Sequence, residues 1–240
     1  MTRIPALILC LMITAVSPSP ALADAGSFEV ADVAAADRLL DARGRVLRLA
    51  GLLPLADNRR AQARLRQLAM ARKVTLTGQA HNRYGEQLAM AYLPDGRWLN
   101  GLLVAEGWML ATPFLAASDQ RAALFRLEAV ARQSGRGHWA GGHFREFRAD
   151  AYRGPRNGYA IVTGRVVAAT GKRQFLFLNF GTDWKTDFTA AVAKRDRKAF
   201  RALDLEALAG RLLRLRGPMR YWNGPFMELT APGQIEILPD

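Results

Sequence analysis

The chain has 240 residues, half of them hydrophobic, which is enough for one large or two small packed domains and excludes general disorder. Its 34 lysines and arginines outnumber 21 aspartates and glutamates, so the formal net charge is +13. This excess favours polyanionic partners such as nucleic acid, an anionic membrane surface or acidic glycans, unless the charge is incidental in an exported protein.

Residues 1–23 have the pattern of a secretory signal peptide. Arg3 supplies the positive start, residues 4–16 form the apolar stretch, and Ala-Leu-Ala at 21–23 predicts cleavage after Ala23. We therefore expect a secreted or periplasmic protein. The apolar stretch is too short for a membrane span, and no later segment reaches about 18 apolar residues. The single cysteine, Cys10, lies in this segment, so the mature chain would have no disulfide and no thiol chemistry.

Residues 24–145 carry the patterns of a first domain. Strands are predicted at residues 28–33, 38–41, 46–52, 74–77 and 87–93, and helices at residues 58–71, 100–106 and 119–133. We expect Asn100 to cap the second helix. The core-facing side chains predicted for the third helix are Ala123, Leu127 and Val130. Three strands, a helix, two strands and a helix pair fit a small Greek-key barrel of the OB type.

Four sequence motifs follow one another in this domain. They are Arg48-Leu49-Ala50-Gly51-Leu52, the Tyr84-Gly85 to Gly107 stretch with Asp95-Gly96 and Asn100, Glu128-x-x-Ala131-Arg132, and Gly135-Arg136-Gly137-His138-Trp139. Their order and spacing resemble the staphylococcal nuclease (thermonuclease-like) family over residues 28–140. The resemblance implies a barrel of that type. It also implies phosphodiester cleavage by a Ca²⁺ ion held by aspartates, a glutamate that acts on the attacking water, and two arginines.

Most positions that the resemblance makes catalytic carry other residues. Of the family's Asp-Gly-Asp, one aspartate remains as Asp37 and the other is Ala35. A further metal-binding aspartate and the glutamate align with Leu53 and Leu55. One carboxylate cannot hold Ca²⁺ tightly, so we expect no metal. The alternative is that Asp57 substitutes for a missing carboxylate, which nothing in its spacing requires.

The two arginines have different fates. The first is kept as Arg48, whereas the second, which would grip the substrate phosphate, is Glu86. Removal of one such electrostatic partner typically costs about 10²–10³ in rate. Asp37 and Arg48 are therefore catalytic remnants, and we expect the site to be inactive.

Residues 146–158 are predicted to be a linker, and residues 159–240 a second OB-like domain. Its expected strands are residues 159–167, 174–180, 187–192, 211–216 and 226–230, with a helix over Lys198–Ala209. This part resembles a module found beside thermonuclease-like domains in bacterial exported proteins, and, less specifically, OB domains that bind nucleic acid. The predicted fold class is therefore mainly β with helices (α+β), as two small OB-type barrels in tandem.

One hairpin of the second domain combines basic and aromatic residues. Its candidate nucleic-acid-binding side chains are Lys172, Arg173, Trp184 and Lys185. Phe175 and Phe177 share one face of a strand, and we expect both in the core, with the cations as ordinary turn residues if nothing binds there. Each half of the mature chain carries a formal charge of +6, so a polyanion site is not restricted to one domain.

Three functions follow from these patterns. The favoured one is a catalytically inactive thermonuclease-like protein that binds nucleic acid or another polyanion. The second is an active metal-dependent phosphodiesterase with a rearranged site. The third is a protein-interaction scaffold in the cell envelope. Fold alone does not decide among them, because function depends on the site.

Overall fold

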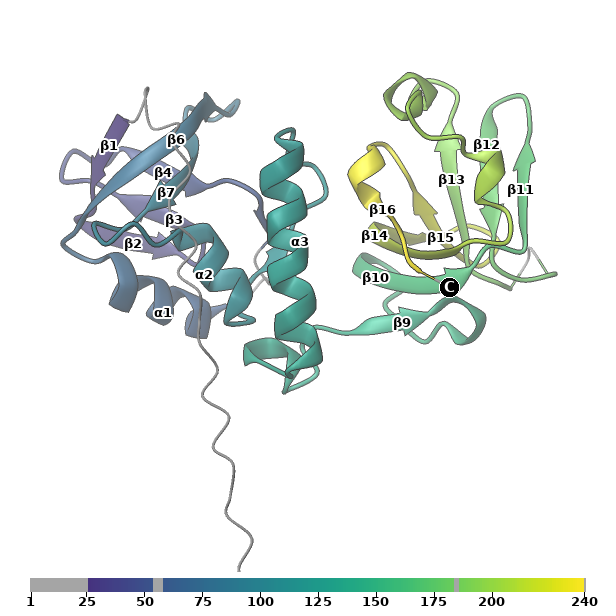
Figure 1. Ribbon diagram of the computed structural model, residues 1–240, viewed down its shortest axis with the longest axis horizontal. Helices are drawn as coiled ribbons and strands as arrows, with labels where there is room; N and C mark the ends of the chain where they lie inside the picture. Colours follow the sequence, from purple (N-terminus) through teal and green to yellow (C-terminus); the bar gives the residue numbers. More distant parts are fainter. Residues whose placement is uncertain (1–25, 54–57, 184–185, 240) are drawn as a thin grey trace, which may run out of the picture.

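The structure, a computed structural model, describes residues 26–53, 58–183 and 186–239 of the chain. The predicted signal peptide lies outside the described residues, as do Leu55 and Asp57. Figure 1 shows two bodies rich in strands, with the long helix α3 (Ser118–Gln133) between them. Each body has its own hydrophobic core. Among the described residues, no helix has the length and apolar character that a membrane crossing requires.

The first body is a six-stranded sheet that closes into a barrel. Its strands are β1 (Gly26–Glu29), β2 (Asp32–Ala35), β3 (Arg38–Leu40), β4 (Val46–Leu49), β6 (Lys73–His81) and β7 (Gln87–Tyr92), adjacent in the order β1-β6-β7-β4-β3-β2. Only Val30 and Ala31 separate β1 from β2. The amide of Val30 donates to the carbonyl of Arg72, and that of Ala31 to the carbonyl of Leu40. The two ends of the sheet are thus halves of one bent strand, which closes the barrel.

Three helices pack beside this barrel in the described part of the chain: α1 (Arg59–Ala69), α2 (Leu99–Ala105) and α3. The side chain of Asn58 caps α1 by accepting a hydrogen bond from the amide of Ala61. The apolar face of α1 points into the core through Ala61, Leu65 and Leu68. The short strands β5 (Leu52–Leu53) and β8 (Leu110–Ala111) pair with each other in a separate two-stranded sheet.

Two predictions about the helices are wrong. Asn100 does not cap α2. It is fully buried, accepts from the amide of Ala91 and donates to the carbonyl of Ala50, so it ties the helix to the barrel. Helix α3 buries a face different from the one expected, namely Leu124, Glu128 and Ala131, and it leaves Val130 half exposed. The reason is that α3 lies between the two barrels. Glu128, on the side predicted to be polar, is buried because that side contacts the second barrel.

The second body repeats the barrel topology. Its strands are β10 (Gly158–Arg165), β11 (Ala168–Gly171), β12 (Phe175–Asn179), β13 (Thr189–Ala193), β14 (Leu212–Tyr221) and β15 (Pro225–Glu228). β10 pairs with β14, and β11 pairs with β12. β10 and β11 are therefore two halves of one bent strand that closes this barrel, as β1 and β2 close the first. In both barrels the third and fifth strands run parallel: β4 beside β7, and β13 beside β15. Both barrels therefore have OB topology, which confirms the predicted fold class.

Three details of the second body differ from the sequence-based expectation. The helix expected over Lys198–Ala209 is two 3-10 turns, η3 (Arg197–Phe200) and η4 (Glu206–Leu208). The carboxylate of Asp204 interrupts the helix by accepting from the amides of Glu206 and Ala207. Residues 168–171, which lie between two expected strands, form the additional strand β11. Two further strands, β9 (Glu146–Arg148) and β16 (Ile235–Ile237), extend the sheet, and β9 uses part of the expected linker.

A buried ion pair joins the two barrels. Nη1 of Arg216, in β14, donates to Oε1 of Glu128, in α3, over 2.8 Å. The other carboxylate oxygen of Glu128 accepts from the amide of Ala111, and the guanidinium of Arg216 lies 3.9 Å from the ring of Phe125. Leu110, Phe144 and Ile161 form a small apolar cluster at the same junction. The contact between the barrels therefore combines a buried ion pair with an apolar cluster.

Candidate functional site

The first candidate site lies at the hairpin between β2 and β3. Asp37 occupies this hairpin and is 1% exposed, while Arg48 lies in the neighbouring strand β4. Nε of Arg48 donates to Oδ2 of Asp37 over 2.8 Å. The structure thus brings together the two residues that the sequence identifies as catalytic remnants, and it joins them to each other.

Glu86 completes this cluster from the hairpin between β6 and β7. Nε of Arg38 donates to one carboxylate oxygen of Glu86 over 2.7 Å, and the side-chain Nδ2 of Asn82 donates to the other over 2.6 Å. The hydrogen bond from Arg38 is the main reason that the pKa of Glu86 is lowered, while its burial acts in the opposite direction. The same hydrogen bond raises the pKa of Arg38. Both groups are therefore held in their charged forms.

Sequence reasoning missed Arg38. It stands where the resembled family has a threonine, and it is 48 residues away from Glu86 in the chain. The sequence did offer one signal: a cation, Arg38, and an anion, Glu86, both stand at positions where the resembled family has other residues. Two carboxylates and two guanidiniums now neutralise one another in this cluster, which we call the closed cluster (Asp37, Arg38, Arg48 and Glu86).

The residues of the closed cluster do not fit a calcium ion. Ca²⁺ takes six to eight oxygen ligands. Within the described residues, no three or more His, Cys, Asp or Glu side chains gather as metal donors. Oδ1 of Asp37 is the one buried carboxylate oxygen of this cluster without a hydrogen-bond partner. Leu53 has no oxygen in its side chain and packs instead on the apolar cluster between the barrels.

His138 and His143, which flank the Gly141-Gly142 turn, also have packing roles. Nε2 of His138 lies 2.8 Å from Oδ1 of Asn58, the residue that caps α1. Its ring meets the rings of Trp108, His143 and Phe144 edge to face. Burial, assisted by the charges of His143 and Arg60, lowers the pKa of His138. The ring is therefore neutral and holds the end of the first domain against α1.

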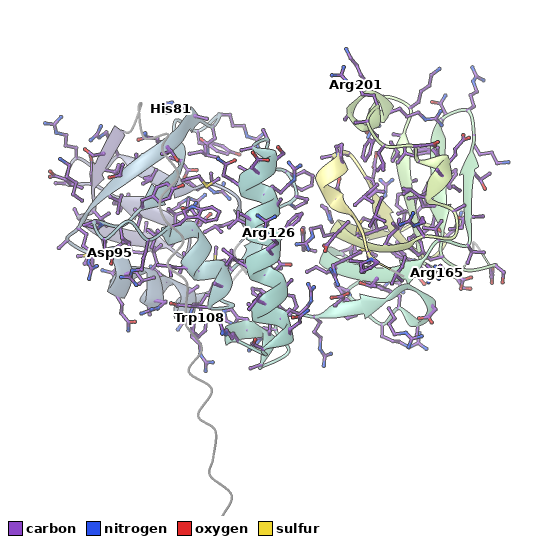
Figure 2. The ribbon with its side chains drawn as sticks, viewed as in Figure 1. His81, Asp95, Trp108, Arg126, Arg165 and Arg201 are labelled. Carbon is purple, nitrogen blue, oxygen red and sulfur yellow. The ribbon has the colours of Figure 1, made fainter. Side chains whose placement is uncertain are left out.

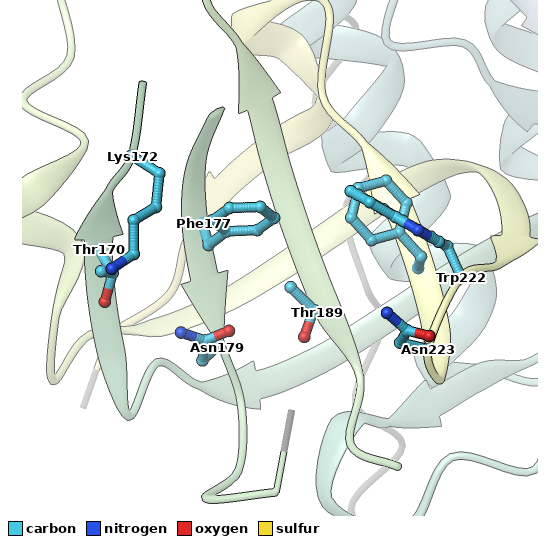
Figure 3. A pocket seen from close by; sticks show the side chains of 8 residues that line it. Thr170, Lys172, Phe177, Asn179, Thr189, Trp222 and Asn223 are labelled. Carbon is cyan, nitrogen blue, oxygen red and sulfur yellow. The ribbon is translucent and has the colours of Figure 1, made fainter. Parts of the chain in front are cut away.

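The second candidate site is a pocket of about 480 Å³ on the second barrel. Its apolar lining is Phe177, Trp222 and Phe226, and its polar lining is Thr170, Lys172, Asn179, Thr189 and Asn223. The side chains labelled in Figure 3 come from β11 and the turn after it, β12, β13 and the turn after β14, and Phe226 belongs to β15. The pocket thus lies across the face of the sheet and is bordered by two hairpins.

The expectation that Phe175 and Phe177 belong to the core is wrong. Leu176 and Leu178 are the buried residues of β12, whereas both phenylalanines are partly exposed on the opposite face. They contact the exposed indole of Trp222, with ring centroids 5.8 Å and 6.5 Å away. Both faces of this strand are apolar, so alternation alone could not decide which one meets the core.

Basic side chains gather at one end of this pocket. Lys172 and Arg173 lie in the β11–β12 hairpin, and the segment after β13 packs on it: the amide of Lys194 donates to the carbonyl of Gln174, and Arg197 to that of Lys172. We call the exposed cations of these segments the basic rim: Lys172, Arg173, Lys194, Lys198 and Arg201. Among the described residues, none of the five has an ion-pair partner, and Arg201 projects from the end of the barrel in Figure 2. Trp184 and Lys185, the other candidate binding residues, lie outside the described residues.

Comparison with known proteins gives a family match for the first of the two domains. No curated protein matches the chain. A family model described as staphylococcal nuclease homologue matches residues 58–141, from the cap of α1 to the turn after Trp139. Glu86 lies within the matched range, whereas Asp37, Arg38 and Arg48 precede it. Residues 58–141 therefore belong to a staphylococcal nuclease homologue domain.

Proposed function

We propose that this protein binds nucleic acid without cleaving it, and that binding takes place on the second barrel. The observation that carries the proposal is the basic rim. Lys172 lines the pocket, the other four exposed cations lie in the same hairpin or in the segment that packs on it, and among the described residues none of the five forms an ion pair. Nearby Arg195 shows the contrast, because Glu228 and Asp196 both pair with it. Unpaired lysines and arginines are the groups that exchange their counterions for phosphates when nucleic acid binds.

The first barrel supplies the reason for a non-catalytic role. Cleavage of a phosphodiester requires positive charge aimed at the phosphate. In the closed cluster, Arg48 is held by Asp37 and Arg38 by Glu86, so neither guanidinium is free. Glu86 would also repel a phosphate at the position where the family has an arginine. The domain keeps the barrel, and its charged groups satisfy one another.

We further propose that the protein acts outside the cytoplasm. This rests on residues 1–23 alone, which combine a positive start, an apolar stretch and an Ala-x-Ala site. Mass spectrometry of the protein from its host would test it. A mature N-terminus at Asp24 supports export, and an intact N-terminus contradicts it.

The binding proposal is tested with the whole protein and labelled DNA and RNA, single- and double-stranded, over a series of salt concentrations. We expect affinity to fall steeply as salt rises, with a slope of log affinity against log salt that reports the number of phosphate contacts. The charge-reversing pair Lys172→Glu and Lys198→Glu should weaken binding at least about 10-fold and flatten the slope by about 2. The control pair, Arg43→Glu and Lys73→Glu, changes the same charge on the first barrel and should have a much smaller effect.

The non-catalytic part is tested by incubating the same substrates with Ca²⁺, Mn²⁺ or EDTA. We expect no cleavage in any of them. Metal-dependent cleavage that disappears in Arg48→Ala would show an active, rearranged site. Absence of binding at about 0.15 M salt, where charges are already screened beyond about 8 Å, would instead favour a role in protein interaction.

A further inference from the structure

The closed cluster of the first barrel and the pocket of the second lie beside hairpins that occupy the same positions in the OB topology. Because their strand connections are the same, the β2–β3 hairpin of the first barrel matches β11–β12 of the second, and β6–β7 matches β14–β15. In the first barrel these hairpins carry Asp37 and Glu86. In the second they carry Lys172 and Trp222.

The same location is filled in one barrel and open in the other. In the first barrel, Arg38 and Arg48 hold the two carboxylates at 2.7 and 2.8 Å. In the second, the space between the hairpins is a pocket of about 480 Å³ lined by aromatic rings and amides. We propose that this pocket holds an unpaired base of a single-stranded nucleic acid. This inference rests on the proposed binding function and specifies its ligand.

The aromatic side of the pocket is suited to stacking. Trp222 is 46% exposed, in a turn in which its amide donates to the carbonyl of Gly224. Its indole meets the ring of Phe226 edge to face, with ring centroids 5.1 Å apart. Phe177 forms the neighbouring wall (Figure 3). A rigid, supported and exposed indole offers a π-face to any base, and such stacking depends little on sequence.

The polar side of the pocket can bind the edge of a base. Asn179 and Asn223 project into it, as do Thr170 and Thr189 (Figure 3). In the described part of the chain, no hydrogen bond occupies the side-chain amide of either asparagine. Each amide has donors and an acceptor, as the edges of bases do. Lys172 at the rim of the pocket is placed to meet the phosphate that follows the base.

A single strand fits this arrangement better than a duplex or an acidic glycan. In a duplex the bases are stacked and paired, so a base would have to leave the helix before it reached Trp222. An acidic glycan could meet the basic rim, but it has no flat π-face for the indole. A single strand presents a π-face and a phosphate in every residue, matching the pocket and the rim together.

The experiment uses the whole protein and four labelled probes: a single-stranded oligonucleotide, its duplex, the same strand with abasic sites in place of its bases, and heparin. The abasic strand keeps the length and the phosphates. We expect the normal single strand to bind about 5- to 100-fold tighter than the abasic strand, which is the range that stacking of a base on one aromatic side chain provides.

Variants locate the effect. Trp222→Ala should lower affinity for the normal strand to near that of the abasic strand, while Trp222→Phe should retain most of the affinity. The matched control is Tyr84→Ala, because Tyr84 is a 72% exposed aromatic residue in the corresponding hairpin of the first barrel. It should leave affinity for every probe unchanged. Circular dichroism of each variant verifies the fold.

The outcomes separate this inference from the function on which it rests. Equal binding of normal and abasic strands, with weakening only in Lys172→Glu/Lys198→Glu, would overturn the base pocket and leave nucleic-acid binding intact. No binding of any nucleic acid would overturn both. Heparin binding that depends on Trp222 as strongly as strand binding does would assign the pocket to acidic glycans and overturn the inference.

Discussion

Arg216 and Glu128 form an ion pair between the two barrels with side chains that are 2% and 0% exposed. Each has further partners. Glu128 also accepts from the amide of Ala111, and Arg216 lies 3.4 Å from Glu236. A charge removed from water in this way is tolerated only while its partner is present. The stability of the protein therefore depends on the two barrels keeping the relative orientation that joins Arg216 to Glu128.

Arg216→Ala should thus be strongly destabilising. It removes the closest cation of the buried Glu128 carboxylate and leaves only the more distant Arg132, 3.7 Å away. We expect a loss of about 3–5 kcal/mol in the free energy of unfolding. The control is Arg195→Ala, which breaks the exposed pair with Glu228 and should cost less than about 1 kcal/mol. Urea denaturation of both variants measures the difference. Equal losses would contradict the importance of the buried pair.

Glu86→Arg restores the residue that the nuclease family carries at this position, yet we expect no cleavage. The new guanidinium would face Arg38 and Arg48 while Asp37 is the single carboxylate left, and Leu53 still offers no oxygen to a metal. Loss of one pair together with like-charge repulsion should destabilise the protein by about 1–2 kcal/mol. The measurements are thermal unfolding and a nuclease assay with Ca²⁺. Cleavage by this variant would show that Glu86 alone blocks the site.

Gly107 and Gly135 make a matched pair for testing the turns around α2 and α3. Both have positive φ, at 75° and 57°. A Cβ on Gly107 would lie 2.2 Å from the carbonyl oxygen of Arg136, whereas one on Gly135 would meet nothing within 4 Å. Gly135→Ala should cost about 1–2 kcal/mol from backbone conformation alone. Gly107→Ala adds a clash with backbone and should cost about 3 kcal/mol or more. Similar melting temperatures for the two variants would refute the close approach.

Stability should fall in acid because of Glu146, which lies between the barrels. Burial acts to raise the pKa of its carboxyl, but the Thr163 hydroxyl and the guanidiniums of Arg214 and Arg132 together lower it. A carboxyl with a lowered pKa in the folded state stabilises the protein above its ordinary pKa of 4.5. That contribution is lost as the pH falls from 4.5 through the lowered value.

The measurement is urea denaturation between pH 7 and pH 3. Glu146→Gln should be less stable than the native chain at pH 7 and should show a shallower loss below pH 4.5. Glu29→Gln is the control, because Glu29 is an exposed carboxylate in β1. It should follow the native curve. A native curve that stays flat down to pH 3 would contradict the linkage.

Much of the fold was determined by local sequence. Asn58 before Arg59–Ala69 defines the start of α1, and the apolar spacing of Ala61, Leu65 and Leu68 defines its buried face. Most strands of the OB barrels lie where the alternation predicted them, because one face of each strand must be apolar and turn residues limit its length. The prediction that catalytic positions are replaced also came from the sequence, since it needs only the identity of the residues at the positions that the resemblance aligns.

Other features depend on which residues meet across space. Arg38 and Glu86 are 48 residues apart, and Arg216 and Glu128 are 88 apart, so neither pair leaves a local pattern. The outward face of β12 was assigned incorrectly because both of its faces are apolar. Only closure of the barrel decides that Leu178 enters the core and Phe177 lines the pocket. The sequence by itself determined the two scaffolds and predicted that catalytic positions are replaced. The tertiary structure decided where charges cancel and where a pocket stays open, because both depend on pairing between distant strands.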